Sequence, residues 1–177
     1  PEEICRGLAD QAGVAAGELV LLVARTASVA GTLQVVARSL ETALHKLHDL
    51  HFDMTRIRAG HGAAPLPPVP GDDMVAIGRT NDAILYGGTV VLDIAADDAS
   101  LAAIGPRAVS GASPAAGEPF LSLFEQAGRD FYALDPALFA PAALQLVSTD
   151  SGRGSRFGRL APDIVARSFE SAASGGS

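Results

Sequence analysis

An arginine and a glutamate stand three residues apart in the stretch QVVARSLETALHKLH, as Arg38 and Glu41. On a helix, residues with this spacing lie on the same face, so a guanidinium group can hold a carboxylate in place. A carboxylate held in this way can act as a general base and acid toward a bound substrate. The alternative is a solvated ion pair that contributes about 0.2–0.5 kcal/mol and no chemistry, and the spacing alone favours that alternative.

The residues around this pair predict one helix from about Thr32 to Leu50. A helical repeat collects the apolar side chains in one sector and the polar side chains on the opposite side. The apolar sector comprises Leu33, Val36, Leu40, Ala43, Leu47 and Leu50. The polar stripe comprises Gln34, Arg38, Glu41, His45 and His48. Such a stripe can line a pocket when its helix follows a strand in an α/β fold.

The segments on either side of this helix are expected to position it. Residues 18–25 (ELVLLVAR) form a short apolar run, which predicts a strand buried on both faces and near the centre of a sheet. Residues 26–31 are a turn of small residues. Residues 60–72 hold four prolines and three glycines, which predicts a stiff, extended loop and excludes a central strand.

The rest of the chain predicts an α/β fold of the α+β type, in which helices pack on a mixed sheet. Helices are expected at 73–86, 119–127 and 162–170, and strands at 89–95, 130–134, 143–149 and 155–160, the last two as a hairpin. Residues 105–117 form a joint rich in Gly, Ala, Ser and Pro, and 171–177 form a flexible tail.

The composition excludes several classes of partner and of site. The 177 residues carry a formal charge of −7, which argues against nucleic acid or an anionic membrane as a partner. No apolar run approaches the ~18 residues of a membrane span, and no secretory leader is expected. The lone Cys5 excludes an internal disulfide and fits the cytoplasm. Three histidines, His45, His48 and His51, do not share one helix face with other ligands, so no metal site is predicted.

Three long segments closely resemble the methenyltetrahydromethanopterin cyclohydrolases of methanogens and methylotrophic bacteria. They are TASVAGTLQVVARSLETALHKLHDLHFD (26–53), GHGAAPLPPVPGDDMVAIGRTNDAILYGG (60–88) and GEPFLSLFEQAGRDFYALDPALFAPA (117–142). The final hairpin is also similar, so that the resemblance covers nearly the whole chain. The chain departs from the family pattern at Arg25, where a proline is usual, and over 97–116.

The resemblance implies the organisation of the protein. Members of the family are about twice as long and consist of two α/β domains with the substrate pocket between them. Residues 1–170 resemble the C-terminal domain, with 1–17 as a possible tail of the first domain. The N-terminal domain is absent from the chain, so the isolated half is expected to be inactive or weakly active without its N-terminal partner. The family also implies a homo-oligomer.

The resemblance also implies the chemistry. The family hydrolyses N5,N10-methenyltetrahydromethanopterin to the N5-formyl compound, without a prosthetic group or a metal, and the tetrahydromethanopterin derivative is the substrate. Its catalytic Arg and Glu match Arg38 and Glu41. The reacting carbon belongs to a formamidinium cation, so a base that takes a proton from water matters more than an oxyanion hole. Glu41 is the expected base, and Arg38 is expected to keep it ionised and aimed.

Further substrate contacts are expected in two segments. Gly60, His61, Gly62 and Pro65 are candidates for a rigid pocket wall, and Thr80, Asn81 and Asp82 for contacts with the pterin edge. Gln34 belongs to the polar stripe. The plainer interpretation of these residues is a stiff connector and a helix with internal polar groups. Tyr86 either stacks on the pterin or packs in the core, and we favour the core.

A non-enzymatic alternative fits the proline-rich stretch. Residues 65–68 (PLPP) could present a polyproline ligand to an aromatic groove, which would make the chain an interaction module. Burial of this loop against the domain would argue against the alternative. Exposure of the loop, with Arg38 and Glu41 in open solvent, would favour it.

Overall fold

A computed structural model describes residues 2–170 of the chain, and the predicted tail at 171–177 lies outside these residues. Four strands form one mixed sheet in the order β1-β2-β3-β4. They are β1 (Ile57–Ala63), β2 (Thr89–Ile94), β3 (Ala143–Ser148) and β4 (Gly154–Gly158). The β2–β3 pair is parallel and the two outer pairs are antiparallel, which confirms the predicted α/β class with a mixed sheet and a C-terminal hairpin.

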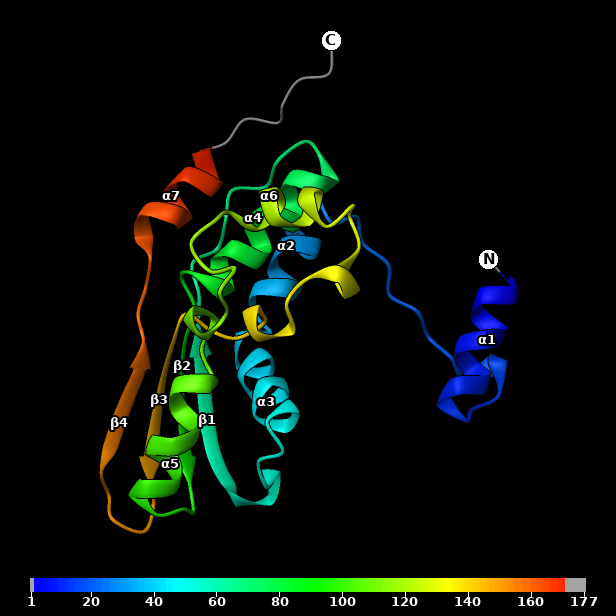
Figure 1. Cartoon of the computed structure of the whole chain (residues 1–177). Helices are drawn as coiled ribbons and strands as arrows, with labels where there is room; N and C mark the ends of the chain where they lie inside the picture. Colours follow the sequence, from blue (N-terminus) through cyan, green and yellow to red (C-terminus); the bar gives the residue numbers. More distant parts are fainter. Residues whose placement is uncertain (1, 171–177) are drawn as a thin grey trace.

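Apart from α1 (Glu2–Ala12), the helices gather in two groups (Figure 1). Helices α3 (Ser39–Asp49) and α5 (Asp98–Ile104) lie beside the sheet, and α2 (Val29–Val36), α4 (Asp73–Leu85), α6 (Phe120–Gln126) and α7 (Pro162–Glu170) lie together beyond its upper end. The connections contain the short 3-10 turns η1 (Ala16–Glu18), η2 (Met54–Arg56), η3 (Gly105–Arg107), η4 (Ser110–Ala112), η5 (Phe131–Ala133) and η6 (Pro136–Leu138). The predicted helices near 73–86, 119–127 and 162–170 are confirmed.

Each group has its own core. On the sheet, Leu92 and Leu146 pack in one cluster with Leu47 of α3 and Leu101 of α5, and all four are at most 2% exposed. Beyond the sheet, an aromatic cluster centres on Phe120, which is fully buried. Its ring lies 5.8 Å from Phe124 and 6.1 Å from Phe139, distances at which aromatic pairs attract.

Tyr86 belongs to the aromatic core, as predicted. Its ring is 4% exposed, and its hydroxyl donates to the Glu118 carbonyl at 2.6 Å and accepts the Gly117 N–H at 3.1 Å. Burial raises the pKa of this phenol. Tyr86 therefore ties the end of α4 to the segment that leads into α6.

The single helix predicted from Thr32 to Leu50 is two helices. The first, α2, ends at Val36, and Arg38 has φ −89° and ψ 17° before α3 begins at Ser39. The break rotates α2 relative to α3, so Leu33 is 52% exposed although Leu47, in the same predicted apolar sector, is fully buried. Arg38 thereby stands at the entry to α3, immediately before its first turn.

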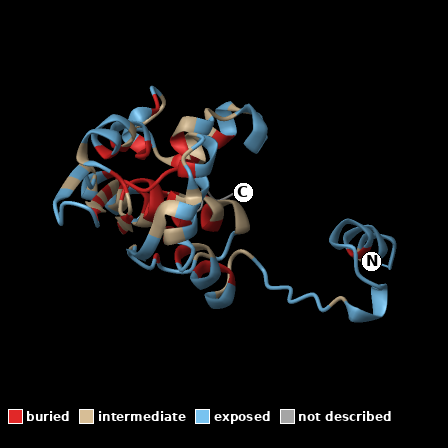
Figure 2. Cartoon of the chain, turned by 90° about the horizontal axis from the view of Figure 1, so that it is seen from below, coloured by how far each residue is buried: buried red, intermediate tan, exposed pale blue. Residues whose placement is uncertain are grey.

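The strand predicted at 18–25 is wrong. Residues 19–25 are extended but belong to no sheet, and Val20, Leu22 and Val23 are 81–95% exposed. We call residues 19–24 the arm. It joins helix α1 (Glu2–Ala12) to the rest of the chain, and Figure 2 colours it as exposed except at Leu19, which is intermediate. The apolar pattern predicted that these side chains are buried, but no other part of the described chain covers them.

Two other segments differ from prediction. Residues 130–134, predicted as a strand, contain the 3-10 turn η5, because the Asp130 carboxylate accepts the Tyr132 N–H and closes a local turn. The first residues of the proline-rich segment, 60–63, belong to edge strand β1, and the remainder is a loop without regular structure. An edge strand tolerates the neighbouring prolines because its outer N–H groups need no partner strand.

Candidate active site

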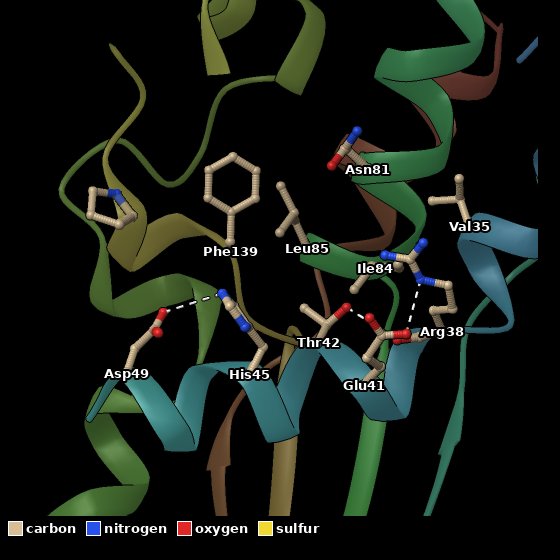
Figure 3. A pocket seen from close by; sticks show the side chains of 11 residues that line it. Val35, Arg38, Glu41, Thr42, His45, Asp49, Asn81, Ile84, Leu85 and Phe139 are labelled. Atoms are coloured by element: carbon tan, nitrogen blue, oxygen red, sulfur yellow. Dashed lines mark hydrogen bonds and ion pairs between the residues drawn. The ribbon is translucent and has the colours of Figure 1, made fainter. Parts of the chain in front are cut away.

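The polar face of α3 lines a cavity of about 390 Å³ (Figure 3). The opposite wall comes from α4 and from the segment around η6, far away in the sequence. The residues around the cavity are Val35, Arg38, Glu41, Thr42, His45, Asp49, Asn81, Ile84, Leu85, Pro136 and Phe139. Charged groups from one helix thus face an aromatic ring and an amide from other elements, which is the composition of a small-molecule site.

Arg38 and Glu41 form the central pair of this cavity. Arg38 Nε lies 3.0 Å from Glu41 Oε2, and the two side chains are 60% and 62% exposed. Figure 3 shows both pointing from α3 toward the cavity. At this exposure the pair contributes little to stability. Its guanidinium group can nevertheless fix the direction of the carboxylate.

A histidine and an aspartate in contact follow one turn later on the same helix face. His45 Nε2 lies 3.6 Å from Asp49 Oδ2, and the imidazole is 71% exposed. His48 Nδ1 is 3.9 Å from the other oxygen of Asp49. The four-residue spacing of His45 and Asp49 is visible in the sequence, but the sequence prediction assigned them no common role. In Figure 3 the His45 ring lies between Asp49 and the Arg38–Glu41 pair.

A buried lysine fixes the far wall to α3. Lys46 is 5% exposed, and its ammonium group donates to the Pro136 carbonyl at 2.8 Å. Burial lowers the pKa of Lys46, and the nearby Asp49 and Asp135 oppose this effect. Because Pro136 and Phe139 both line the cavity, this bond sets the distance between α3 and the aromatic wall.

Two glycines of β1 allow α3 to lie directly on the sheet. A Cβ at Gly60 would come within 2.6 Å of the Leu92 side chain and 3.1 Å of the Leu40 side chain. A Cβ at Gly62 would come within 2.8 Å of the Leu40 backbone nitrogen. These glycines were predicted as a pocket wall. In the structure they lie beneath the first turn of α3. They let this turn, which carries Arg38 and Glu41, pack closely against the sheet.

The remaining predicted contacts are dispersed. Asn81 is at the cavity, and its Nδ2 donates to the Ile77 carbonyl at 2.9 Å. Its neighbour Thr80 is buried and bonds within α4, to the Ala76 carbonyl. His61 and Pro65 are exposed and do not line the cavity. Gln34 lies on α2 beside the arm, away from the Arg38–Glu41 pair.

Asp82 lies in the interior, between α4 and α6. It is fully buried, and its Oδ1 accepts the Phe120 N–H at 2.8 Å, which joins α4 to the start of α6. Burial raises the pKa of Asp82 to about 6, against smaller opposing contributions from Ser168 and the Phe120 N–H. Of these three neighbours, Thr80 and Asp82 therefore face the interior, and Asn81 faces the cavity.

The raised pKa of Asp82 predicts a pH-dependent stability. The folded state holds the proton more tightly than the unfolded state, where the pKa is 3.8, so the stability contribution falls as pH rises from about 4 to about 6. Above this window the cost is at most about 3 kcal/mol. We expect Asp82→Asn, measured by urea unfolding, to be more stable than the parent at pH 7 and to lose this advantage near pH 4.

The matched control for this prediction is Asp163→Asn, at an exposed position in the first turn of α7. Its difference from the parent should not follow the same pH window. A stability difference for Asp82→Asn that stays constant between pH 4 and pH 7 would show that folding does not raise the pKa of Asp82.

No three His, Cys, Asp or Glu side chains among residues 2–170 are grouped so as to hold a metal ion. In the same part of the chain, no helix is both long enough and apolar enough to cross a bilayer.

Comparison with known proteins gives one family. The family model described as Cyclohydrolase (MCH) matches residues 1–169. Proteins named methenyltetrahydromethanopterin cyclohydrolase are similar over 94–96% of the chain, with 46% identity in Rhodopirellula baltica, 45% in Methylobacterium sp. strain 4-46 and 37% in Methanospirillum hungatei. The matches cover 51–52% of these relatives, so the chain spans about half their length.

Proposed function

Because this chain belongs to the methenyltetrahydromethanopterin cyclohydrolase family, we propose that it carries the catalytic pair of an enzyme that hydrolyses N5,N10-methenyltetrahydromethanopterin to the N5-formyl compound. The observation that carries the proposal is the 3.0 Å contact between Arg38 and Glu41 at the wall of a cavity. The active site is completed by the half of the protein that this chain does not contain, and the enzyme acts in cytoplasmic one-carbon metabolism as a homo-oligomer.

The reaction requires proton transfer at one carbon. Water attacks the formamidinium carbon while Glu41 takes one of its protons, which gives a neutral carbinolamine. Glu41 then returns this proton to N10 as the bond between the carbon and N10 breaks. The hydroxyl proton leaves as the N5-formyl group forms, so that one cation and one water yield a neutral product and one proton. No electron is transferred, and the carbon keeps its oxidation state.

The surrounding residues suit this substrate. The positive charge of Arg38 would repel a cationic substrate, but its pairing with Glu41 offsets that charge. The Phe139 ring offers an apolar face for the flat pterin, and Asn81 offers an amide at the cavity for its polar edge. Asn81 is the predicted substrate contact that we retain in this role.

The interaction-module alternative has less support. In the proline-rich loop, Pro67 is buried and the Pro68 carbonyl accepts from Arg79 Nη1 at 2.9 Å, so the loop is tied to α4. A polyproline ligand must leave its domain surface to enter an aromatic groove. This packing favours the enzyme, although Leu66 is 56% exposed.

The proposal is tested by following the loss of methenyl absorbance with this chain alone and with the complementary half of the Rhodopirellula baltica relative. We expect little hydrolysis by the chain alone, because one wall of its cleft is missing, and measurable turnover by the mixture. A stable complex of the two halves that leaves the absorbance unchanged would overturn the proposed activity.

His45 is placed to receive the proton that the reaction releases. Its imidazole lies 3.6 Å from Asp49 and 71% of the side chain is exposed, so it connects the cavity with bulk water. In the reconstituted enzyme at low buffer concentration, we expect His45→Gln to lower the rate about tenfold, less than the ~10²–10⁴ of a directly acting acid or base. Added imidazole should restore the rate. A loss that imidazole does not reverse would assign His45 a purely structural role.

A further inference from the structure

The chain contains a single lysine, and this lysine is buried beside the cavity. Lys46 is the only lysine among the 13 Lys and Arg residues, and it is 5% exposed. It lies on α3 between Thr42 and Asp49, which both line the cavity. A lysine is almost never buried unless its ammonium group has a partner. The partner here is the Pro136 carbonyl, 2.8 Å away on the opposite wall.

The opposite wall belongs to a segment without a regular helix or strand. Residues 127–142 connect α6 to β3 and contain only the short 3-10 turns η5 and η6. Among residues 2–170, the Lys46 bond is the one hydrogen bond that joins α3 to this segment. The distance between the two walls therefore depends on a few side-chain contacts, because no strand ladder or long helix fixes it.

A second set of bonds holds the same turn from its other side. Asp135 Oδ1 accepts the Ala137 N–H at 2.9 Å and thereby caps η6, and Asp135 Oδ2 accepts the Ser113 hydroxyl at 2.5 Å. Leu138, at the end of the turn, is fully buried in the aromatic core. Phe139 follows it and lies across the cavity from α3 (Figure 3). The turn from which Phe139 projects is thus held by α3 on one side and by this cap on the other.

The spacing of the two walls matters for a flat ligand. A ring gains contact energy from an aromatic wall only near van der Waals distance, and a gap of about 0.5–1 Å forfeits roughly a quarter to a half of it. In the proposed function, Phe139 contacts the flat ring of the substrate and not the carbon that reacts. Such contacts are the same in the ground state and the transition state, so their loss raises KM and leaves kcat unchanged.

We propose that Lys46 is a positioning residue, whose bond to the Pro136 carbonyl holds Phe139 at the distance from α3 that a flat pterin ring needs. It sets the affinity for the substrate and takes no part in the proton transfer. Lys46 itself does not line the cavity. The inference rests on the proposed function for the identity of the ligand, and it assigns substrate affinity to a buried residue behind the cavity wall.

The first test is Lys46→Met in the reconstituted halves, with the loss of methenyl absorbance as the measurement. Methionine keeps the unbranched stem and removes the ammonium group. We expect KM to rise roughly tenfold and kcat to stay within about twofold of the parent. Removal of a positive charge alone would strengthen the binding of a cation, so the two explanations predict opposite changes in KM. A lower or unchanged KM, or a loss confined to kcat, would overturn the inference.

A second variant tests the same wall if Lys46→Met does not fold. Asp135→Ala removes the cap of η6 and should raise KM by a similar factor, although it leaves Lys46 in place. Asp135→Asn is the matched control, because its side-chain oxygen can still accept the Ala137 N–H and asparagine caps as well as aspartate. The control should keep the parent KM. An alanine variant that also keeps the parent KM would contradict the inference.

Amide hydrogen exchange tests the Lys46 bond without any turnover. In the parent chain the Ala137 N–H is bonded to Asp135 Oδ1, and the Leu138 N–H is bonded to the Asp135 carbonyl at 3.0 Å. We expect both amides to exchange roughly tenfold faster in Lys46→Met, because the turn opens more often without its link to α3. Unchanged exchange would show that the bond does not hold η6 and would overturn the inference.

Exchange and turnover separate this inference from the proposed function. Faster exchange in Lys46→Met, together with no turnover by the parent mixture, contradicts the activity and supports the role of Lys46 in holding η6. Turnover by the parent mixture with a KM that Lys46→Met leaves unchanged supports the activity and contradicts the positioning role.

Discussion

Replacing Glu41 with glutamine is expected to lower the rate of methenyl hydrolysis by roughly 10²–10⁴-fold, the range that a positioned acid or base supplies. The amide has nearly the size and shape of the carboxylate and can still accept from Arg38 Nε, 3.0 Å away in the parent. It cannot take a proton from water. The measurement is the initial loss of methenyl absorbance by the reconstituted halves.

The control for this substitution is Glu125→Gln on α6. Glu125 also has an arginine partner on the surface, with Arg129 Nη2 4.0 Å from its Oε1, but it does not line the cavity. We expect the control to retain full activity. Unchanged turnover by Glu41→Gln would remove Glu41 from the mechanism, whatever the geometry of its ion pair.

The ion pair of Arg38 and Glu41 could be predicted from the sequence because its evidence is local. Arg38 and Glu41 are three residues apart, and helical periodicity alone places them on the polar side of Leu47. The packing of α3 confirms this side, since Leu47 is fully buried and Glu41 is exposed. The same periodicity joined α2 and α3 into one helix, because nothing in the local pattern marks the break before Ser39.

The walls of the cavity could not be predicted in the same way. Phe139 and Pro136 reach it through η6, about a hundred residues after Glu41, and the Lys46 bond that fixes them depends on tertiary packing. Conversely, Gly62 was predicted as part of the pocket wall. In the structure it lies under α3, where the absence of a side chain lets the helix approach the sheet. Polar residues and glycines in the sequence indicate which segments lie near the cavity. Which of them line it and which support α3 depends on tertiary packing.

The arm is the segment in which the sequence prediction and the structure differ most. Residues 18–25 have the composition of a buried strand, and that prediction is wrong for this chain because its described residues offer the arm no sheet. The apolar pattern and the exposed position become compatible if burial occurs in a partner. A failed local prediction thus carries information about assembly.

Replacing Arg38 with methionine is expected to lower the rate about 10²-fold, the cost of misplacing a reacting group by about 1 Å. Methionine keeps much of the apolar stem and removes the guanidinium group. Lysine should give an intermediate rate, because it restores the charge without the planar fork that fixes a carboxylate. Since both members of the pair are about 60% exposed, unfolding free energies should change by less than about 1 kcal/mol.

The double variant decides how Arg38 acts. If Arg38 serves by aiming Glu41, its replacement should cost little more once Glu41 is glutamine, because residues that act as a unit are strongly non-additive. If Arg38 instead binds the substrate independently, the two losses should multiply. Arg129→Met, which breaks the similar surface pair with Glu125, is the control and should leave turnover unchanged. Multiplying losses would leave Glu41 as the base and move Arg38 from positioning the carboxylate to holding the pterin.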